Sequence, residues 1–157
     1  MTGKPPLDKS KGGFLRKMKV HCKITMIEKW KGEFIMKRSV INTNIEWAMD
    51  LCKRMNFNLP DFFYWTPQEW EEKKNKTEKM TSVGLGWDVT DYGSGDFDKI
   101  GAVLGTLRNG VMGDMTRPYC EKIIAMKEGQ QLPRHFHYEK TEDIINRCGG
   151  TLCVEVW

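Results

Sequence analysis

The chain has 157 residues, 39% of them hydrophobic and 29% charged, which is enough apolar material for the core of about one domain. No stretch approaches the roughly 18 consecutive apolar residues of a membrane span, and the N-terminus lacks the apolar region of a secretory signal. The net charge of +4 comes from residues 1–35, where nine basic and three acidic residues give +6, whereas the sixteen basic and eighteen acidic residues that remain give −2. We therefore expect a cytoplasmic protein without a nucleic-acid or membrane partner.

Residues 1–35 differ in composition from the rest of the chain and show no sustained hydrophobic period. Three interpretations compete: a basic arm that binds an anionic surface, an organelle transit peptide, and translation from a non-native upstream start. The third is favoured because Lys31-Gly32-Glu33 can be encoded by a ribosome-binding sequence shortly before the Met36 codon. We predict that this basic leader is dispensable and that the natural protein starts near Met36.

Residues 36–80 are expected to form an N-terminal helical segment with two helices. Ser39 is the predicted cap of the first, which ends near Asn56 and has apolar residues at helical spacing: Ile41, Ile45, Ala48, Met49, Cys52 and Met55. The second runs from residue 67 to about 76, because Thr66 and Glu69 form a capping box with proline at the first helical position. The tryptophans at 65, 70 and 87 could stack on a sugar, but core packing is the favoured interpretation.

Residues 81–157 carry strand and turn signals, and they predict a mostly β fold. A glycine-rich loop around Trp87 comes first, and the predicted strands follow at Ala102–Arg108, Pro118–Lys127, His135–His137, Asp143–Arg147 and Thr151–Trp157. Closely spaced strands separated by glycine turns are typical of a barrel or sandwich.

The five cysteines (Cys22, Cys52, Cys120, Cys148 and Cys153) are an odd set without a CxxC pair. This pattern gives little support to a disulfide framework or a zinc finger. Cys148 and Cys153 could contribute to a metal site, but small buried thiols are the favoured interpretation.

His135 and His137 are two residues apart, so their imidazoles should project from one face of an extended strand. Glu142 follows a short turn and can return a carboxylate to the same point. Two imidazoles and one carboxylate suit a divalent metal such as Mn, Fe, Zn or Ni, and they leave positions open for water or substrate. An isolated HxH is more often a pair of solvent-exposed polar side chains without a ligand. The spacing from Gly129 through these residues to Gly149, however, is similar to the first metal-binding motif of the cupin superfamily.

Longer runs extend this likeness well beyond the metal motif. They are Met36–Ser39, Tyr64–Pro67, Gly86–Asp96, Thr106–Gly110, Arg117–Lys122 and Glu142–Arg147. With these runs the chain resembles the D-lyxose isomerases of the cupin superfamily from about Met36 to Val156.

The resemblance implies a cupin or jelly-roll barrel preceded by two α-helices, with Mn²⁺ held by His135, His137 and Glu142. It also implies interconversion of D-lyxose and D-xylulose through an enediol, with Lys122 near the sugar. We accordingly expect a pentose substrate and a homodimer.

Relatives of this kind continue through further strands that carry a fourth ligand, a histidine, and a carboxylate that moves the proton. We therefore expect an incomplete barrel in residues 81–157, and weak isomerase activity or none. Two other functions stay open. A dioxygenase-like metal cupin fits the ligand set but not the long family-like runs. A non-catalytic metal- or sugar-binding half-domain fits the shorter chain.

Overall fold

A computed structural model describes residues 36–111, 113–138 and 141–156. The expected leader at residues 1–35 lies outside this range, so the predictions made for it stay untested. Within it the order of elements is α1 (Arg38–Arg54), the short 3-10 helix η1 (Asp61–Phe63), α2 (Pro67–Glu72), α3 (Lys74–Ser82), β1 (Gly86–Thr90), β2 (Ala102–Arg108) and β3 (Glu121–Ala125). No helix in the described ranges combines the length and hydropathy needed to cross a lipid bilayer.

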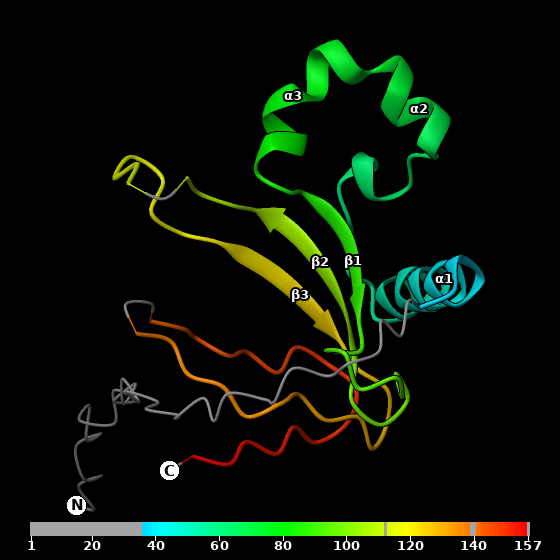
Figure 1. The fold of residues 1–157 in the computed structure, drawn as a ribbon, viewed down its shortest axis with the longest axis vertical. Helices are drawn as coiled ribbons and strands as arrows, with labels where there is room; N and C mark the ends of the chain where they lie inside the picture. The colour runs from blue at the N-terminus through cyan, green and yellow to red at the C-terminus, as the bar shows by residue number, and fades with distance from the viewer. Residues whose placement is uncertain (1–35, 112, 139–140, 157) are drawn as a thin grey trace, which may run out of the picture.

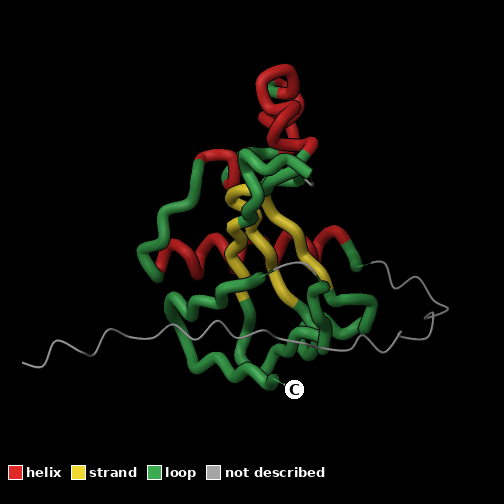
Figure 2. The backbone as a smooth tube through the Cα atoms, turned by 90° about the vertical axis from the view of Figure 1, so that its left-hand side faces the viewer, coloured by secondary structure: helices red, strands yellow, loops and turns green. Residues whose placement is uncertain are grey.

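The three strands form one antiparallel sheet in the order β1-β2-β3. Helix α1 lies across one face of this sheet, whereas α2 and α3 stand at the end where β1 begins (Figures 1 and 2). Residues 126–138 and 141–156 run past the other face as extended lengths of chain (Figure 1). Among the described residues the sheet is thus the middle layer, and a helix covers only one of its faces.

The core lies between α1 and the sheet because the strand side chains alternate between two faces. Val103 on β2 pairs with Val89 on β1 and with Ala125 on β3, so all three side chains point to the same side. Val103 and Ala125 are buried against Ala48 of α1 and Phe97. A second cluster, made of Cys52, Leu59 and Phe63, continues this core toward η1.

Helix α1 confirms the predicted first helix but not its predicted cap. The N-cap is Lys37, in extended conformation and without a side-chain cap hydrogen bond. The amide of Ile41 donates to the carbonyl oxygen of Lys37 at 3.1 Å, so Ser39 lies inside the first turn, where its hydroxyl cannot cap. Asn44, Ala48 and Cys52 are buried, and their spacing of four residues places them on one helix face.

The capping box is confirmed, and it precedes a helix that is interrupted sooner than predicted. The Thr66 hydroxyl accepts from the Glu69 amide, and the Glu69 carboxylate accepts from the Thr66 amide. Lys73, with φ −92° and ψ 3°, separates α2 from α3. The hydroxyl of buried Thr77 donates to the Lys73 carbonyl oxygen at 3.1 Å, which ties the start of α3 to this break.

The three tryptophans in question make the packing contacts that were favoured over sugar stacking. Trp65 and Trp70 lie edge to face with their ring centroids 5.1 Å apart, and Trp87 meets Phe63 in the same manner at 4.8 Å. The Trp87 indole N–H also donates to the Phe63 carbonyl oxygen at 3.0 Å. This indole therefore fastens the sheet to η1.

The strands agree with prediction in the centre of the sheet and depart from it on both sides. Strand β2 has the predicted bounds, but β3 covers only part of Pro118–Lys127, and β1 forms where a glycine-rich loop was expected. None of the three strands predicted after residue 130 joins a ladder among the described residues. The α-helices have 17, 6 and 9 residues and the strands 5, 7 and 5, so a mostly β composition is not seen in the described chain.

The cysteines correct another expectation. Cys52 is a buried thiol as expected. Its pKa is raised, chiefly by burial and to a smaller extent by the nearby Cys148. Cys148 and Cys153, for which buried thiols were the favoured interpretation, are exposed, and so is Cys120, because the segments that carry them lie outside the helix-covered core.

Candidate metal centre

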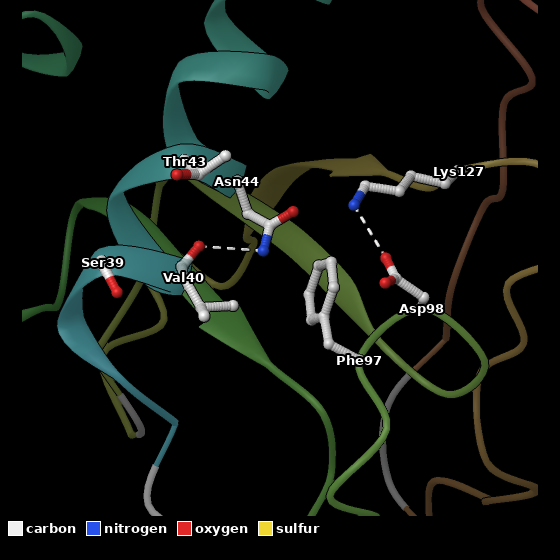
Figure 3. A pocket seen from close by; sticks show the side chains of 7 residues that line it. All are labelled: Ser39, Val40, Thr43, Asn44, Phe97, Asp98 and Lys127. Atoms are coloured by element: carbon white, nitrogen blue, oxygen red, sulfur yellow. Dashed lines mark hydrogen bonds and ion pairs between the residues drawn. The ribbon is translucent and has the colours of Figure 1, made fainter.

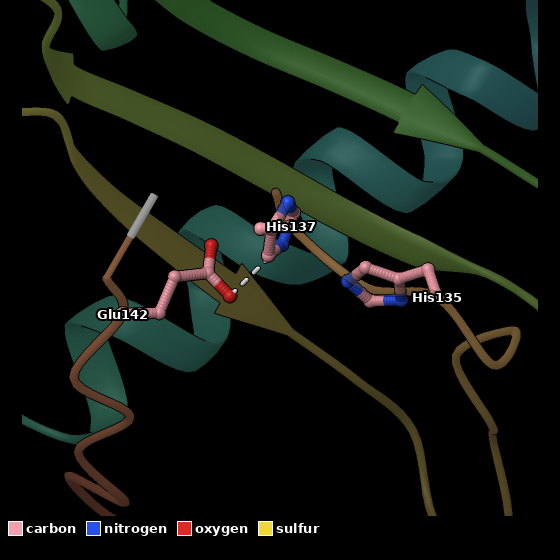
Figure 4. Close-up of side chains that lie close together, drawn as sticks. All are labelled: His135, His137 and Glu142. Atoms are coloured by element: carbon pink, nitrogen blue, oxygen red, sulfur yellow. Dashed lines mark ion pairs between the residues drawn. The ribbon is translucent and has the colours of Figure 1, made fainter. Parts of the chain in front are cut away.

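The structure brings His135, His137 and Glu142 together at one place. One ligand atom from each residue lies within 4.8 Å of the others, and Figure 4 shows the three side chains in front of the sheet with α1 behind it. The two imidazole centroids are 5.0 Å apart, with an angle of 77° between the ring planes. This proximity was predicted from the sequence, although His135–His137 is not a strand in the described chain.

A backbone carbonyl sets the tautomer of His135. Its Nδ1 lies 2.8 Å from the carbonyl oxygen of Pro133. Because a carbonyl oxygen only accepts, Nδ1 carries the proton, and in the neutral ring Nε2 keeps its lone pair. A histidine that donates through one nitrogen and leaves the other as a ligand is the usual arrangement at a protein metal site.

The Nε2 atom of His137 is a buried polar atom without a hydrogen bond. It lies 3.1 Å from Oε2 of Glu142, but the geometry of this approach is that of an ion pair and not of a hydrogen bond. Buried nitrogen atoms rarely lack a partner. A cation beside the His137 imidazole and the Glu142 carboxylate would give Nε2 a partner, so the residues present fit a bound divalent metal.

Two glycines frame the centre at the positions predicted from the motif. Gly129 and Gly149 have φ values of +80° and +92°, a region that side chains with a Cβ rarely adopt. The chain therefore turns sharply before His135 and again after Glu142.

The sequence did not predict which residues fix the segment that leads into this centre. Buried Gln130 donates through its side chain to the Phe97 carbonyl oxygen and accepts from the Lys127 amide at 2.7 Å. The Gln131 amide donates to the Lys99 carbonyl oxygen at 2.9 Å. The available signal was the polar residue directly after the glycine turn, because backbone groups that are buried at a turn need hydrogen-bond partners.

Lys122 lies on β3 opposite Thr106 of β2 and is exposed. Its neighbours Ile123 and Ala125 pack into the core on the α1 side. Because strand side chains alternate, Lys122 points to the other face, the side on which Figure 4 shows the histidines. The structure thus puts Lys122 and the three candidate ligands on the same side of the sheet.

A cavity of about 260 Å³ lies elsewhere, between α1 and residues 97–98 (Figure 3). Lys127 and Asp98 in its wall form an ion pair at 2.8 Å, and the Asn44 side chain donates to the Val40 carbonyl oxygen. Neither histidine of the centre lines it. The candidate metal centre therefore lies outside this cavity.

Comparison with known proteins places this centre in a family. The family model described as D-lyxose isomerase matches residues 36–157. The D-lyxose/D-mannose isomerase of Escherichia coli O157:H7 is 40% identical over 125 residues, which are 78% of this chain and 55% of that protein. The protein of the same name from Serratia proteamaculans is 40% identical over 124 residues, 77% of this chain and 54% of its own. The chain thus spans about half the length of these relatives, and it belongs to the D-lyxose isomerase family.

Proposed function

We propose that this chain forms the metal-holding part of a Mn²⁺-dependent aldose–ketose isomerase, built on an incomplete cupin barrel. The observation that carries the proposal is the convergence of His135, His137 and Glu142 in a chain that belongs to the D-lyxose isomerase family. The two relatives are named D-lyxose/D-mannose isomerases. We infer D-lyxose and D-xylulose as the pair interconverted here.

The donor set supports the choice of a divalent metal. Imidazole nitrogens from His135 and His137 and a Glu142 oxygen suit a borderline ion, and Mn²⁺ accepts this mixture. When bound, such an ion acts as a Lewis acid on sugar oxygens, which eases removal of a proton from the carbon beside the carbonyl. The chain's own contribution is to hold three donors on one side and leave the other side to the substrate.

Lys122 is the proposed positioning group for the sugar. A protonated lysine donates hydrogen bonds and carries a positive charge. Both properties would hold a sugar hydroxyl and stabilise the negative charge that develops on oxygen as the proton leaves. Its place on the same face as the candidate ligands supports this role.

The cellular setting is also part of the proposal. Cys52, Cys120, Cys148 and Cys153 are free thiols, a state typical of a reducing compartment. We therefore propose a cytoplasmic enzyme that acts on free pentoses.

A second candidate is a metal- or sugar-binding half-domain without catalysis. It is favoured by the coverage of only 54–55% of the relatives' length, since whole-enzyme chemistry can need groups from the remaining part. Binding of Mn²⁺ without any turnover would support it.

The test measures conversion of D-lyxose to D-xylulose with added Mn²⁺. It is run on the chain alone and on the chain mixed with the part of the E. coli O157:H7 relative outside the matched region. We expect weak turnover from the chain alone and clear turnover from the mixture. Absence of turnover in both, with D-lyxose and with D-mannose, would contradict the proposed activity.

Single substitutions then assign the residues in whichever sample turns over. His137→Ala should abolish turnover, and Lys122→Met should lower it by ~100-fold, the usual cost of losing a charge-stabilising donor. Lys127→Met is the matched control, because Lys127 pairs with Asp98 away from the centre. Equal rates in the two lysine variants would remove Lys122 from the site.

A further inference from the structure

Two cysteines that are far apart in the sequence belong to segments that meet in the fold. Cys52 lies in the last turn of α1 and is 5% exposed. Cys148 follows the candidate ligand Glu142 in the chain and is exposed, and both cysteines are free thiols. A buried thiol beside a reachable one differs from a lone surface cysteine, because the second sulfur can react with the oxidised form of the first.

The side chain of Phe57 connects the two segments. Its amide donates to the Cys52 carbonyl oxygen at 2.8 Å, and its ring packs against the core cluster that contains Cys52. The Arg147 guanidinium lies 5.0 Å from the centroid of the same ring. Because Cys148 is the next residue after Arg147, its backbone is held close to the last turn of α1.

A turn restrains Cys148 from its other side. The Asn146 side chain donates to the Gly150 carbonyl oxygen at 3.0 Å, and this bond spans Cys148. Gly149, within the same turn, has φ +92°, a region that favours glycine. The path of the chain on both sides of Cys148 is therefore defined by contacts.

The two thiols also differ in how readily they ionise. The pKa of Cys52 is raised, first by burial and then by Cys148, since two thiolates close together repel each other. A buried thiol with a raised pKa stays protonated at neutral pH and reacts slowly with an oxidant. Cys148, which solvent reaches, is therefore the thiol that an oxidant meets first.

We propose that Cys52 and Cys148 form a reversible disulfide bond when the protein meets a peroxide. The Cys148 sulfur attacks one oxygen of hydrogen peroxide, so the O–O bond breaks and a sulfenic acid and one water molecule result. The Cys52 sulfur then attacks the Cys148 sulfur. The S–O bond breaks, its oxygen leaves as a second water with the proton of Cys52, and the S–S bond forms. Overall the two thiols lose two hydrogen atoms, and a small thiol such as dithiothreitol restores them by exchange.

The bond ties α1 to the segment that carries Glu142. A disulfide holds its two Cα atoms within ~7 Å of each other, so oxidation fixes how closely residues 141–156 lie against the last turn of α1. Cys148 follows Glu142 by six residues, and the restraint therefore acts near the candidate metal centre without replacing any of its ligands. This inference does not depend on isomerase activity.

The test treats the full chain with one equivalent of hydrogen peroxide. Disulfides are then mapped by mass spectrometry of a proteolytic digest made without reductant. We expect a pair of peptides joined through Cys52 and Cys148 that dithiothreitol separates. The readout needs neither metal nor sugar, so its failure and failure of the proposed activity are distinguishable.

Matched serine substitutions assign the partners. Cys148→Ser should abolish the linked pair, because it removes the thiol that reacts first, and an exposed site tolerates serine. Cys153→Ser is the control, since Cys153 is also exposed and lies five residues further along, and it should leave the pair unchanged. Absence of any link would overturn the proposal, and so would a link from Cys148 to Cys153, to Cys22 or to a second copy of the chain in place of Cys52.

Discussion

In the part of the chain that the structure describes, residues 36–125 bury their apolar side chains in a core, whereas residues 126–156 leave theirs exposed. In the first region every strand has a ladder partner and the apolar faces meet between α1 and the sheet. In the second, alternating apolar residues such as Leu152 and Val154 remain exposed. Strand-like sequence patterns occur in both regions. The difference teaches that a strand pattern becomes a strand only where a partner completes it.

The two regions nevertheless touch, at Gln130 and Phe97 and again at Arg147 and Phe57. The Arg147 guanidinium lies 5.0 Å from the Phe57 ring centroid, and Phe57 packs against the core cluster of Cys52 and Leu59. A cation–aromatic contact of this kind contributes ~0.5–1 kcal/mol at an exposed site. It can orient the second region, but it cannot replace a ladder.

The largest expected effect is a loss of stability, and it concerns the packed region, residues 36–125, alone. Phe63 is 3% exposed and contacts the rings of Phe62 and Trp87. Phe63→Ala should lower the free energy of unfolding by ~3–5 kcal/mol through lost burial and the cavity left behind. Tyr138→Ala, at a residue 88% exposed, should change it by less than ~0.5 kcal/mol. Urea unfolding measures both, and equal losses would mean that the second region is packed too.

The next effect concerns the candidate metal centre of the second region. A double variant with alanine at His135 and His137 should weaken Mn²⁺ binding by at least ~100-fold, because a single carboxylate remains to hold the ion. Glu155→Gln is the control, since Glu155 is an acidic residue of the same region that pairs with Arg134. Equilibrium dialysis gives the affinities. Equal metal binding by the double variant and the wild-type chain would exclude the site.

The sequence predicts those parts of the fold that local chemistry decides. The capping box of Thr66 and Glu69 needs only residues three apart, and α1 needs only its apolar spacing. Strand β1 was missed because Gly84, Gly86, Gly93 and Gly95 dominate the local pattern, while pairing with β2 decides the outcome. The reverse error occurred at Thr151–Trp157, where the local pattern is strong and no described partner completes a ladder.

For the candidate site, spacing predicted which residues meet but not how they are held. The HxH pair, Glu142 and the two flanking glycines were read directly from the chain. The anchoring of Gln130 to Phe97 joins residues 33 positions apart, a contact that no local pattern encodes. The Pro133 carbonyl that sets the His135 tautomer depends likewise on the folded path of the chain.

A smaller effect compares the two regions with one identical substitution. A Cβ at Gly105 on β2 would lie 3.0 Å from Phe63 and 3.1 Å from Trp87, whereas one at Gly150 would meet nothing within 4 Å. Gly105→Val should therefore cost ~1–3 kcal/mol of stability through overpacking. Gly150→Val should cost less than ~0.5 kcal/mol. Thermal unfolding of both variants checks this, and a large loss at Gly150 would contradict the open packing of residues 126–156.

The smallest expected effect concerns a local interaction in the packed region, the capping box of Thr66 and Glu69. The Glu69 carboxylate accepts hydrogen bonds from the Thr66 amide at 2.7 Å and from the Thr66 hydroxyl at 2.9 Å. These bonds, the backbone one first, lower the pKa of Glu69 from its ordinary value of 4.5. A carboxyl group whose pKa is lower in the folded state stabilises the fold above its unfolded pKa, and this contribution is lost as the pH falls through the folded pKa.

Glu69→Gln should therefore lower the melting temperature at pH 7, and the difference from wild type should shrink as the pH is taken from about 5 down to about 3. Glu72→Gln is the control, since it removes a carboxylate from the same helix without touching the capping box. A constant difference across this pH range would show that the Glu69 side chain acts through shape and not through its charge.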